Sequence, residues 1–137
     1  YVHWGHDISP EENQYEADLK FAISYKKNTN FIGQKFLNKI KNQKIKKKFV
    51  ILSLEESKPG FPLLLHDEPI YCNNQIVGRT TSGNYSFNFK KNIAFGYLNT
   101  SKALDAKNLE IEIEKKKYKI NLEEKPLHDA GNKIIRE

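Results

Sequence analysis

At 137 residues, with 38% hydrophobic and 12% aromatic residues, the chain is long enough for one small domain. It contains no run of eighteen apolar residues, which excludes a membrane-spanning helix, and residues 1–9 lack the pattern of a secretory signal. The net charge is +6, but only Arg79 and Arg136 are arginines. Because phosphate and base recognition favours arginine, we interpret the lysines as a solvated surface.

Cysteine and histidine usage argues against a complete catalytic or metal site. Cys72 is the only cysteine, so it cannot form an internal disulfide, which suits a reducing compartment and predicts a cytoplasmic protein. It ends the predicted strand Pro69–Cys72 with no histidine beside it, which indicates a packed thiol. The four histidines lack metal-ligand spacing, and no serine elbow, Walker loop or dinucleotide motif is present. We therefore expect no metal.

The first third of the chain mixes several signals. Ser9-Pro10-Glu11-Glu12 predicts a helix start, and the partial alternation of Tyr15–Tyr25 predicts a strand. Phe31–Lys41 carries an apolar stripe at helical spacing and predicts a helix, which Asn30 can cap. The basic run Lys44–Lys48 indicates a solvated linker.

Strand signals dominate after residue 48. Phe49–Leu54 predicts a strand, and Pro69–Cys72 pairs with Gln75–Thr81 around a two-residue Asn73-Asn74 turn. Gly83 and Asn84 predict a turn within Thr81–Ser86, ahead of a strand at Asn92–Leu98. Small residues mark points where a barrel strand must bend or touch a neighbour, and these are Gly78, Ala94 and Gly96.

The last predicted hairpin alternates cleanly. Leu109–Glu114 and Tyr118–Leu122 each have one apolar and one charged face, with Lys115–Lys117 as the turn. The sequence therefore predicts a mainly β fold, a small antiparallel Greek-key-like β-barrel. A basic barrel also admits an alternative function, a nucleic-acid-binding module, which predicts affinity that falls steeply with salt.

The segment Ile76–Leu98 resembles the C-terminal barrel signature of the glycine-cleavage T-protein (aminomethyltransferase) family. The residues that fit that pattern are Val77, Gly78, Thr81, Ser82, Gly83, Tyr85, Ser86, Ile93, Ala94 and Tyr97. Further matches are Trp4-Gly5-His6-Asp7, Tyr15-Glu16-Ala17-Asp18-Leu19, the Phe31-Ile32-Gly33 helix start and the tail Pro126–Gly131. Taken together, these motifs are most similar to the folate-binding C-terminal region of sarcosine and dimethylglycine dehydrogenases.

The resemblance implies a division into three parts. Residues 1–30 would be a short remnant of an α+β folate-binding domain, residues 31–48 a connecting helix and linker, and residues 49–137 the barrel. It also implies that Glu16 binds the pterin ring of tetrahydrofolate, because a carboxylate accepts two parallel hydrogen bonds from adjacent pterin donors. Trp4 would pack against the same flat ring.

The resemblance further implies that the catalytic aspartate lies in the folate domain upstream of Tyr1, so no catalytic residue is expected in this chain. In the dehydrogenase members a flavin domain, which binds FAD, lies further upstream. The parent activity would be one-carbon transfer to tetrahydrofolate in glycine, sarcosine or dimethylglycine catabolism. We expect the isolated fragment to be inactive, and residues 1–30 to pack loosely or against a neighbouring chain.

Overall fold

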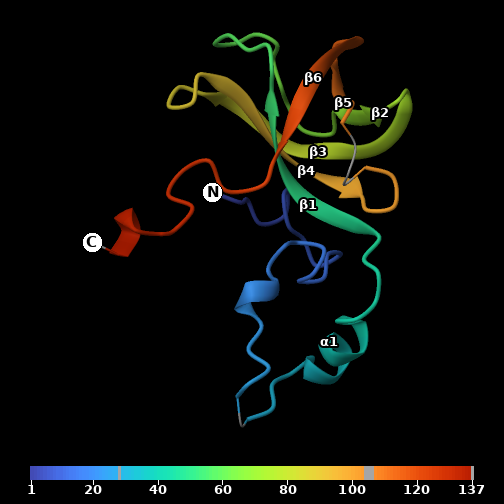
Figure 1. Cartoon of the computed structure of the whole chain (residues 1–137), viewed down its shortest axis with the longest axis vertical. Coiled ribbons are helices and arrows are strands. Elements are labelled where there is room, and N and C mark those ends of the chain that lie inside the picture. The colour runs from blue at the N-terminus through green and yellow to red at the C-terminus, as the bar shows by residue number, and fades with distance from the viewer. Residues whose placement is uncertain (28, 104–106, 137) are drawn as a thin grey trace.

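Six antiparallel strands form a closed barrel in this computed structural model, which describes residues 1–27, 29–103 and 107–136 (Figure 1). The strands are β1 (Lys47–Leu54), β2 (Pro69–Cys72), β3 (Gln75–Ser86), β4 (Lys91–Asn99), β5 (Leu109–Ile113) and β6 (Lys116–Glu123). The expected ranges 1–30 and 49–137 include residues 28, 104–106 and 137, which lie outside this description. The mainly β prediction is confirmed.

The barrel has Greek-key connectivity, because β1 lies beside β4 instead of β2. Its strand order is β1-β4-β3-β2-β5-β6, and the ring closes where β1 pairs with β6. Only the second half of β1 makes that closure, with Ile51 opposite Glu123 and Leu54 opposite Ile120. The arrangement agrees with the expected Greek-key-like barrel.

Alternation along the strands builds the core. In β5 every second side chain is buried, so Leu109, Ile111 and Ile113 point inward while the glutamates between them point outward. Leu52 on β1 and Leu98 on β4 are completely buried in the same cluster. Cys72 is a buried free thiol, as its strand position predicted.

The expected turn at Thr81–Ser86 is wrong, because β3 continues through it. Gly83 pairs with Ala94, and a Cβ at Gly83 would lie 2.5 Å from Leu64 Cγ. The glycine therefore serves close approach of the chain and not a turn. The chain reverses after Ser86, where Lys90 has a φ of 53°.

Two hairpin predictions have different outcomes. Asn73 and Asn74 have φ values of 47° and 65°, which confirms the two-residue turn between β2 and β3. The β5–β6 turn lies earlier than expected, at Glu114 and Lys115, with φ values of 51° and 65°. β6 accordingly begins at Lys116, inside the predicted turn.

The predicted strand at Tyr15–Tyr25 is wrong. The Asn13 side chain accepts hydrogen bonds from the Tyr15 and Glu16 N–H groups, which bends the chain into a turn, and Asp18 has a φ of 58°. The 3-10 helix η1 (Lys20–Ala22) follows. At Ser9 the hydroxyl and N–H both donate to Glu12, but only a turn forms there and the expected helix is absent.

The helix α1 (Gln34–Ile40) lies within the range predicted for it. It begins at Gln34 because Gly33 is the N-cap, with a φ of 87°, in place of the expected Asn30. Leu37 is its buried residue, whereas Phe36 of the predicted stripe is exposed. No helix in the described ranges is long and apolar enough to cross a membrane.

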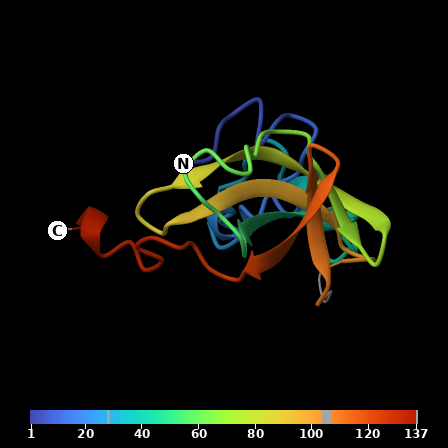
Figure 2. The same cartoon turned by 90° about the horizontal axis from the view of Figure 1, so that it is seen from above.

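The two ends of the chain differ in how they meet the barrel. Residues 1–18 lie along the barrel beside β1, whereas the tail after β6, with η2 (Ile134–Arg136), extends away from it (Figures 1 and 2). Asp7, Ile8, Tyr15 and Ala17 are buried. The expectation that residues 1–30 pack loosely is therefore wrong for this first stretch, because it is fastened to the barrel by buried hydrogen bonds.

Candidate functional site

Asp7 joins the N-terminal stretch to the barrel. The residue is 1% exposed, and its carboxylate Oδ1 accepts hydrogen bonds from the Thr81 and Ser82 hydroxyls at 2.6 and 2.7 Å. Oδ2 accepts the His3 N–H at 2.8 Å. The Tyr97 hydroxyl donates to the Asp7 main-chain oxygen at 2.9 Å. Side chains of β3 and β4 thus hold one residue of the Trp4-Gly5-His6-Asp7 segment.

Glu16 is located by its main chain. Its carbonyl oxygen accepts the Phe49 N–H of β1 at 2.7 Å, so the turn that carries Glu16 continues the hydrogen bonding of the barrel. The half-buried carboxylate accepts the Asn13 N–H through Oε2 at 3.3 Å. No described residue donates to Oε1, so the carboxylate keeps the acceptor capacity that a ligand with paired N–H donors needs.

A cavity of about 520 Å³ lies between Glu16 and the strands β3 and β4. Its walls carry the charged residues Lys46, Lys47, Asp67 and Arg79, and Tyr97 contributes an aromatic ring. Arg79 is paired with Asp67, and Lys47 with Glu12. Its size is within the range of small-molecule sites. Glu16 also borders a smaller cavity of about 240 Å³, toward Lys44 and Lys46.

Trp4 lies apart from both cavities that Glu16 borders. Its side chain is 69% exposed, on the tight loop His3–Ile8, and it lines neither of them. The structure therefore keeps the two predicted folate-contacting residues on one N-terminal stretch without bringing them to a shared wall.

Burial raises the pKa of the Tyr97 hydroxyl far above its ordinary value, and the nearby carboxylates of Glu12, Glu16 and Asp7 raise it further. Tyr97 is therefore a neutral hydrogen-bond donor across the physiological range. This state matches its observed contact, because only the protonated hydroxyl can donate to the Asp7 carbonyl.

A partly buried ion pair joins the N-terminal stretch to the start of β1. Lys47 Nζ lies 2.6 Å from Glu12 Oε1, and the Glu12 side chain is only 9% exposed. Burial alone would raise the pKa of Glu12, but hydrogen bonds from Lys47 and Ser9 outweigh it, so the pKa lies below its ordinary value.

The lowered pKa of Glu12 predicts acid-dependent stability. The unfolded chain binds a proton at Glu12 more readily than the folded chain does, so the contribution is fully present at neutral pH. It is lost as the pH falls below the ordinary glutamate pKa and through the lower pKa of Glu12 in the folded chain. We expect Glu12→Gln to cost about 1 kcal/mol of unfolding free energy at pH 7 and little at acidic pH. Denaturant unfolding at both pH values measures this.

Asp18→Asn is the matched control for Glu12→Gln, because Asp18 pairs with Lys48 at 3.6 Å with its side chain 63% exposed. An exposed pair of this kind contributes little, so the control should change stability by less than about 0.5 kcal/mol. Equal losses in the two variants at neutral pH would contradict the assigned role of Glu12.

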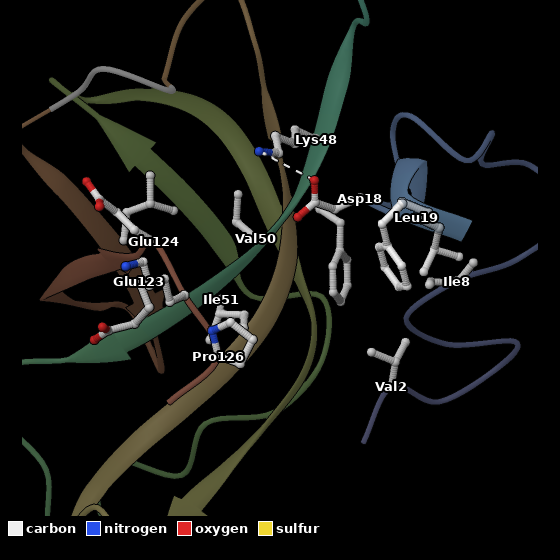
Figure 3. A pocket seen from close by; sticks show the side chains of 15 residues that line it. Val2, Ile8, Asp18, Leu19, Lys48, Val50, Ile51, Glu123, Glu124 and Pro126 are labelled. Carbon is white, nitrogen blue, oxygen red and sulfur yellow. Dashed lines mark ion pairs between the residues drawn. The ribbon is translucent and has the colours of Figure 1, made fainter. Parts of the chain in front are cut away.

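A second large cavity, of about 670 Å³, lies between the N-terminal stretch and the strands β1 and β6 (Figure 3). Ile8 and Leu19 face Val50 and Ile51 across it, and the Asp18–Lys48 pair closes one side (Figure 3). Its walls are mainly apolar, and they carry no group of three or more potential metal ligands. Nor does any such group occur elsewhere in the described ranges.

Chain comparisons identify the barrel. The family described as the glycine cleavage T-protein C-terminal barrel domain matches residues 47–129, more than half of the chain. The chain belongs to this family. The match begins at Lys47, the first residue of β1, so the T-protein barrel and the observed barrel start together.

Relatives of this T-protein barrel are much longer enzymes. The chain is 31% identical over 136 residues to 4-methylaminobutanoate oxidase (formaldehyde-forming) of Paenarthrobacter nicotinovorans, covering 99% of the chain and 16% of the oxidase. It is 31% identical to human mitochondrial dimethylglycine dehydrogenase, covering 90% and 14%. It is 34% identical to the aminomethyltransferase of Listeria welshimeri, covering 91% and 33%.

A solved structure supports the same T-protein fold. Glycine cleavage system aminomethyltransferase T from Bartonella henselae aligns with a TM-score of 0.80 at 20% identity, covering 95% of this chain and 36% of that one. The chain thus spans about a third or less of the relatives named here. The similarity extends beyond the barrel and includes most of the N-terminal stretch.

Sequence reasoning missed the role of Asp7. The residue belongs to the Trp4–Asp7 motif, but its hydroxyl partners lie 74 and 75 positions away in the sequence. The available signal was that the chain keeps two family-like motifs, Trp4–Asp7 and Thr81–Gly83, which the fold brings together.

Proposed function

We propose that this chain is the folate-side C-terminal segment of an aminomethyltransferase-like enzyme. The enzyme would transfer a one-carbon unit to tetrahydrofolate, from an aminomethyl group or from the iminium left by amine oxidation. The observation that carries the proposal is the Glu16 carboxylate, which the barrel holds beside a 520 Å³ cavity with acceptor capacity to spare.

The chemistry of Glu16 suits a pterin. The ring presents an N–H and an amino group side by side, and a carboxylate accepts both in parallel. The main-chain hydrogen bond between Glu16 and Phe49 fixes the backbone from which the Glu16 side chain extends. Less conformational entropy is therefore lost when a ligand binds the carboxylate. Trp4 lines neither cavity that Glu16 borders, so it would contact the ring system only where upstream sequence extends the site toward its loop.

The rest of the site would come from upstream sequence. We assign residues 1–30 to the folate domain and residues 31–48 to the connection, whose last two residues, Lys47 and Lys48, already belong to β1. Phe21, which is 85% exposed, and Val2, which is also exposed, both line the cavity of Figure 3, as expected for a face that a larger protein covers. In dehydrogenase-type parents an FAD-binding domain would precede both. The single cysteine favours a reducing compartment, and we propose a cytoplasmic location.

Glu16→Gln in the longer protein should weaken tetrahydrofolate binding by about 1–3 kcal/mol. The amide replaces one acceptor with a donor that faces the pterin N–H groups. Isothermal titration calorimetry with tetrahydrofolate measures the loss. Glu56→Gln is the matched control, because it makes the same charge change at an exposed residue next to β1 and should leave the affinity unchanged.

The 137-residue chain alone should bind tetrahydrofolate negligibly, since Glu16 without the remaining walls competes poorly with water. Micromolar binding by this chain, or equal affinity of the Glu16→Gln and unaltered longer proteins, would refute the placement of the site.

A further inference from the structure

The burial of Asp7 calls for a physical reason. A carboxylate that is 1% exposed is costly unless its oxygens are satisfied. Within the described ranges no lysine, arginine or histidine side chain pairs with it, and all its partners are neutral hydroxyl and N–H donors. Since a surface contact would serve as well for simple attachment, the arrangement points to a geometric role.

A bulge in β3 positions the two hydroxyl groups that donate to Asp7. Thr80 pairs with Gly96 and Ser82 with Phe95, so Thr81 is an extra residue in the strand. Successive side chains of a regular strand point to opposite faces. The bulge breaks that alternation, and both the Thr81 and Ser82 hydroxyls reach the same oxygen of Asp7.

The loop on the other side is closed around Asp7. The His3 carbonyl accepts the Asp7 N–H at 2.8 Å, and the Gly5 N–H donates to the Ile8 carbonyl at 2.8 Å. With the His3 N–H on Oδ2, Asp7 bonds the two ends of the loop to each other as well as to the barrel. Trp4 is the large exposed side chain that this loop presents.

We propose that Asp7 is a positioning residue, through which the β3 bulge and Tyr97 of β4 fix the His3–Ile8 loop and thereby orient Trp4. That this orientation serves pterin binding rests on the function proposed above. The barrel would then contribute to the folate site by fixing the loop that carries Trp4, at a distance from the cavities that Glu16 borders, without touching the reacting atoms.

Trp4 is the only tryptophan, so its fluorescence reports the loop directly in the 137-residue chain. The test variant is Thr81→Val combined with Ser82→Ala, which removes both hydroxyl donors at nearly constant volume. Time-resolved anisotropy should show the amplitude of fast Trp4 motion rising at least about twofold. Asp7→Ala should behave in the same way, and the hydroxyl variant keeps the test valid if Asp7→Ala does not fold.

Asp7→Asn is the rescue variant. An asparagine oxygen can accept the His3 N–H while its amide donates to the two hydroxyls, so Trp4 motion should stay close to that of the unaltered chain. Thr100→Val combined with Ser101→Ala is the matched control, since these hydroxyls bond to Ile45 and Asn99 and not to the loop.

Circular dichroism and thermal unfolding establish that each variant is folded, and a merely structural role would lower the melting temperature without changing Trp4 motion in the native state. Unchanged anisotropy in the folded Thr81→Val, Ser82→Ala variant would overturn the proposal. So would a Trp4 as mobile in Asp7→Asn as in Asp7→Ala.

The folate connection has its own readout. In the longer protein the Thr81→Val, Ser82→Ala variant should raise KM for tetrahydrofolate about fivefold and leave kcat within about twofold. If the unaltered longer protein binds no tetrahydrofolate, the proposed function fails while the Trp4 result stands. If it binds and the variant leaves KM unchanged, the positioning of Trp4 has no role in the site.

Discussion

Replacing Gly78 with alanine is expected to destabilise the barrel by about 3 kcal/mol, the upper end of the cost of overpacking. A Cβ at this position would lie 2.2 Å from the Tyr97 carbonyl oxygen and 2.9 Å from Leu98 Cδ2. The first contact is with the backbone of the neighbouring strand, which cannot move away without breaking the β3–β4 ladder. Urea unfolding followed by circular dichroism measures the loss.

Two other glycines provide a graded control. At Gly83 the nearest contact is the Leu64 side chain at 2.5 Å, and a side chain can shift, so Gly83→Ala should cost less than Gly78→Ala. At Gly131 nothing lies closer than 3.7 Å, and Gly131→Ala should stay within about 0.5 kcal/mol of the unaltered chain. A Gly78→Ala chain as stable as Gly131→Ala would contradict the observed approach of β3 to β4.

Leu52→Ala is expected to cost about 2–5 kcal/mol, through lost burial and the cavity left behind. Leu52 is completely buried at the centre of β1, the strand that pairs with both β4 and β6. Its environment is formed by strands on both sides, so collapse into the vacated space is restricted. Chemical denaturation should show a lower midpoint with an unchanged slope.

Leu65→Ala serves as the comparison for Leu52→Ala, because Leu65 has the same side chain but is 48% exposed in the loop before β2. It should lose less than about 1 kcal/mol. Similar losses of unfolding free energy in Leu52→Ala and Leu65→Ala would contradict the placement of Leu52 in the barrel core.

Predicting the barrel from sequence worked where one strand face is buried and the other solvated. Leu109–Ile113 alternates because its inward residues enter the core, and that pattern survives without knowledge of partners. The turn predicted at Thr81–Ser86 is wrong because polarity there does not mark exposure to solvent. Its polar residues are typical of a turn, but two of them are satisfied by Asp7 and the segment stays paired with β4.

The candidate site shows the same limit. Trp4 and Glu16 could be proposed from a motif resemblance, but the position of Glu16 on the barrel depends on its hydrogen bond with Phe49, a distant residue that no local pattern identifies. The role of Asp7 does not follow from local sequence, since its burial depends on contacts with Thr81, Ser82 and Tyr97, all more than seventy positions later.

The seam of the barrel has a consequence for the chain during its synthesis. Residues 51–54 of β1 acquire their β6 partners, residues 120–123, only about 70 residues later. At a translation rate of ~5–20 residues per second, this edge stays open for several seconds on the ribosome. An open strand edge can pair with another nascent chain. The N-terminal stretch, which precedes β1 in the chain, bonds to the Phe49 N–H shortly before that open edge.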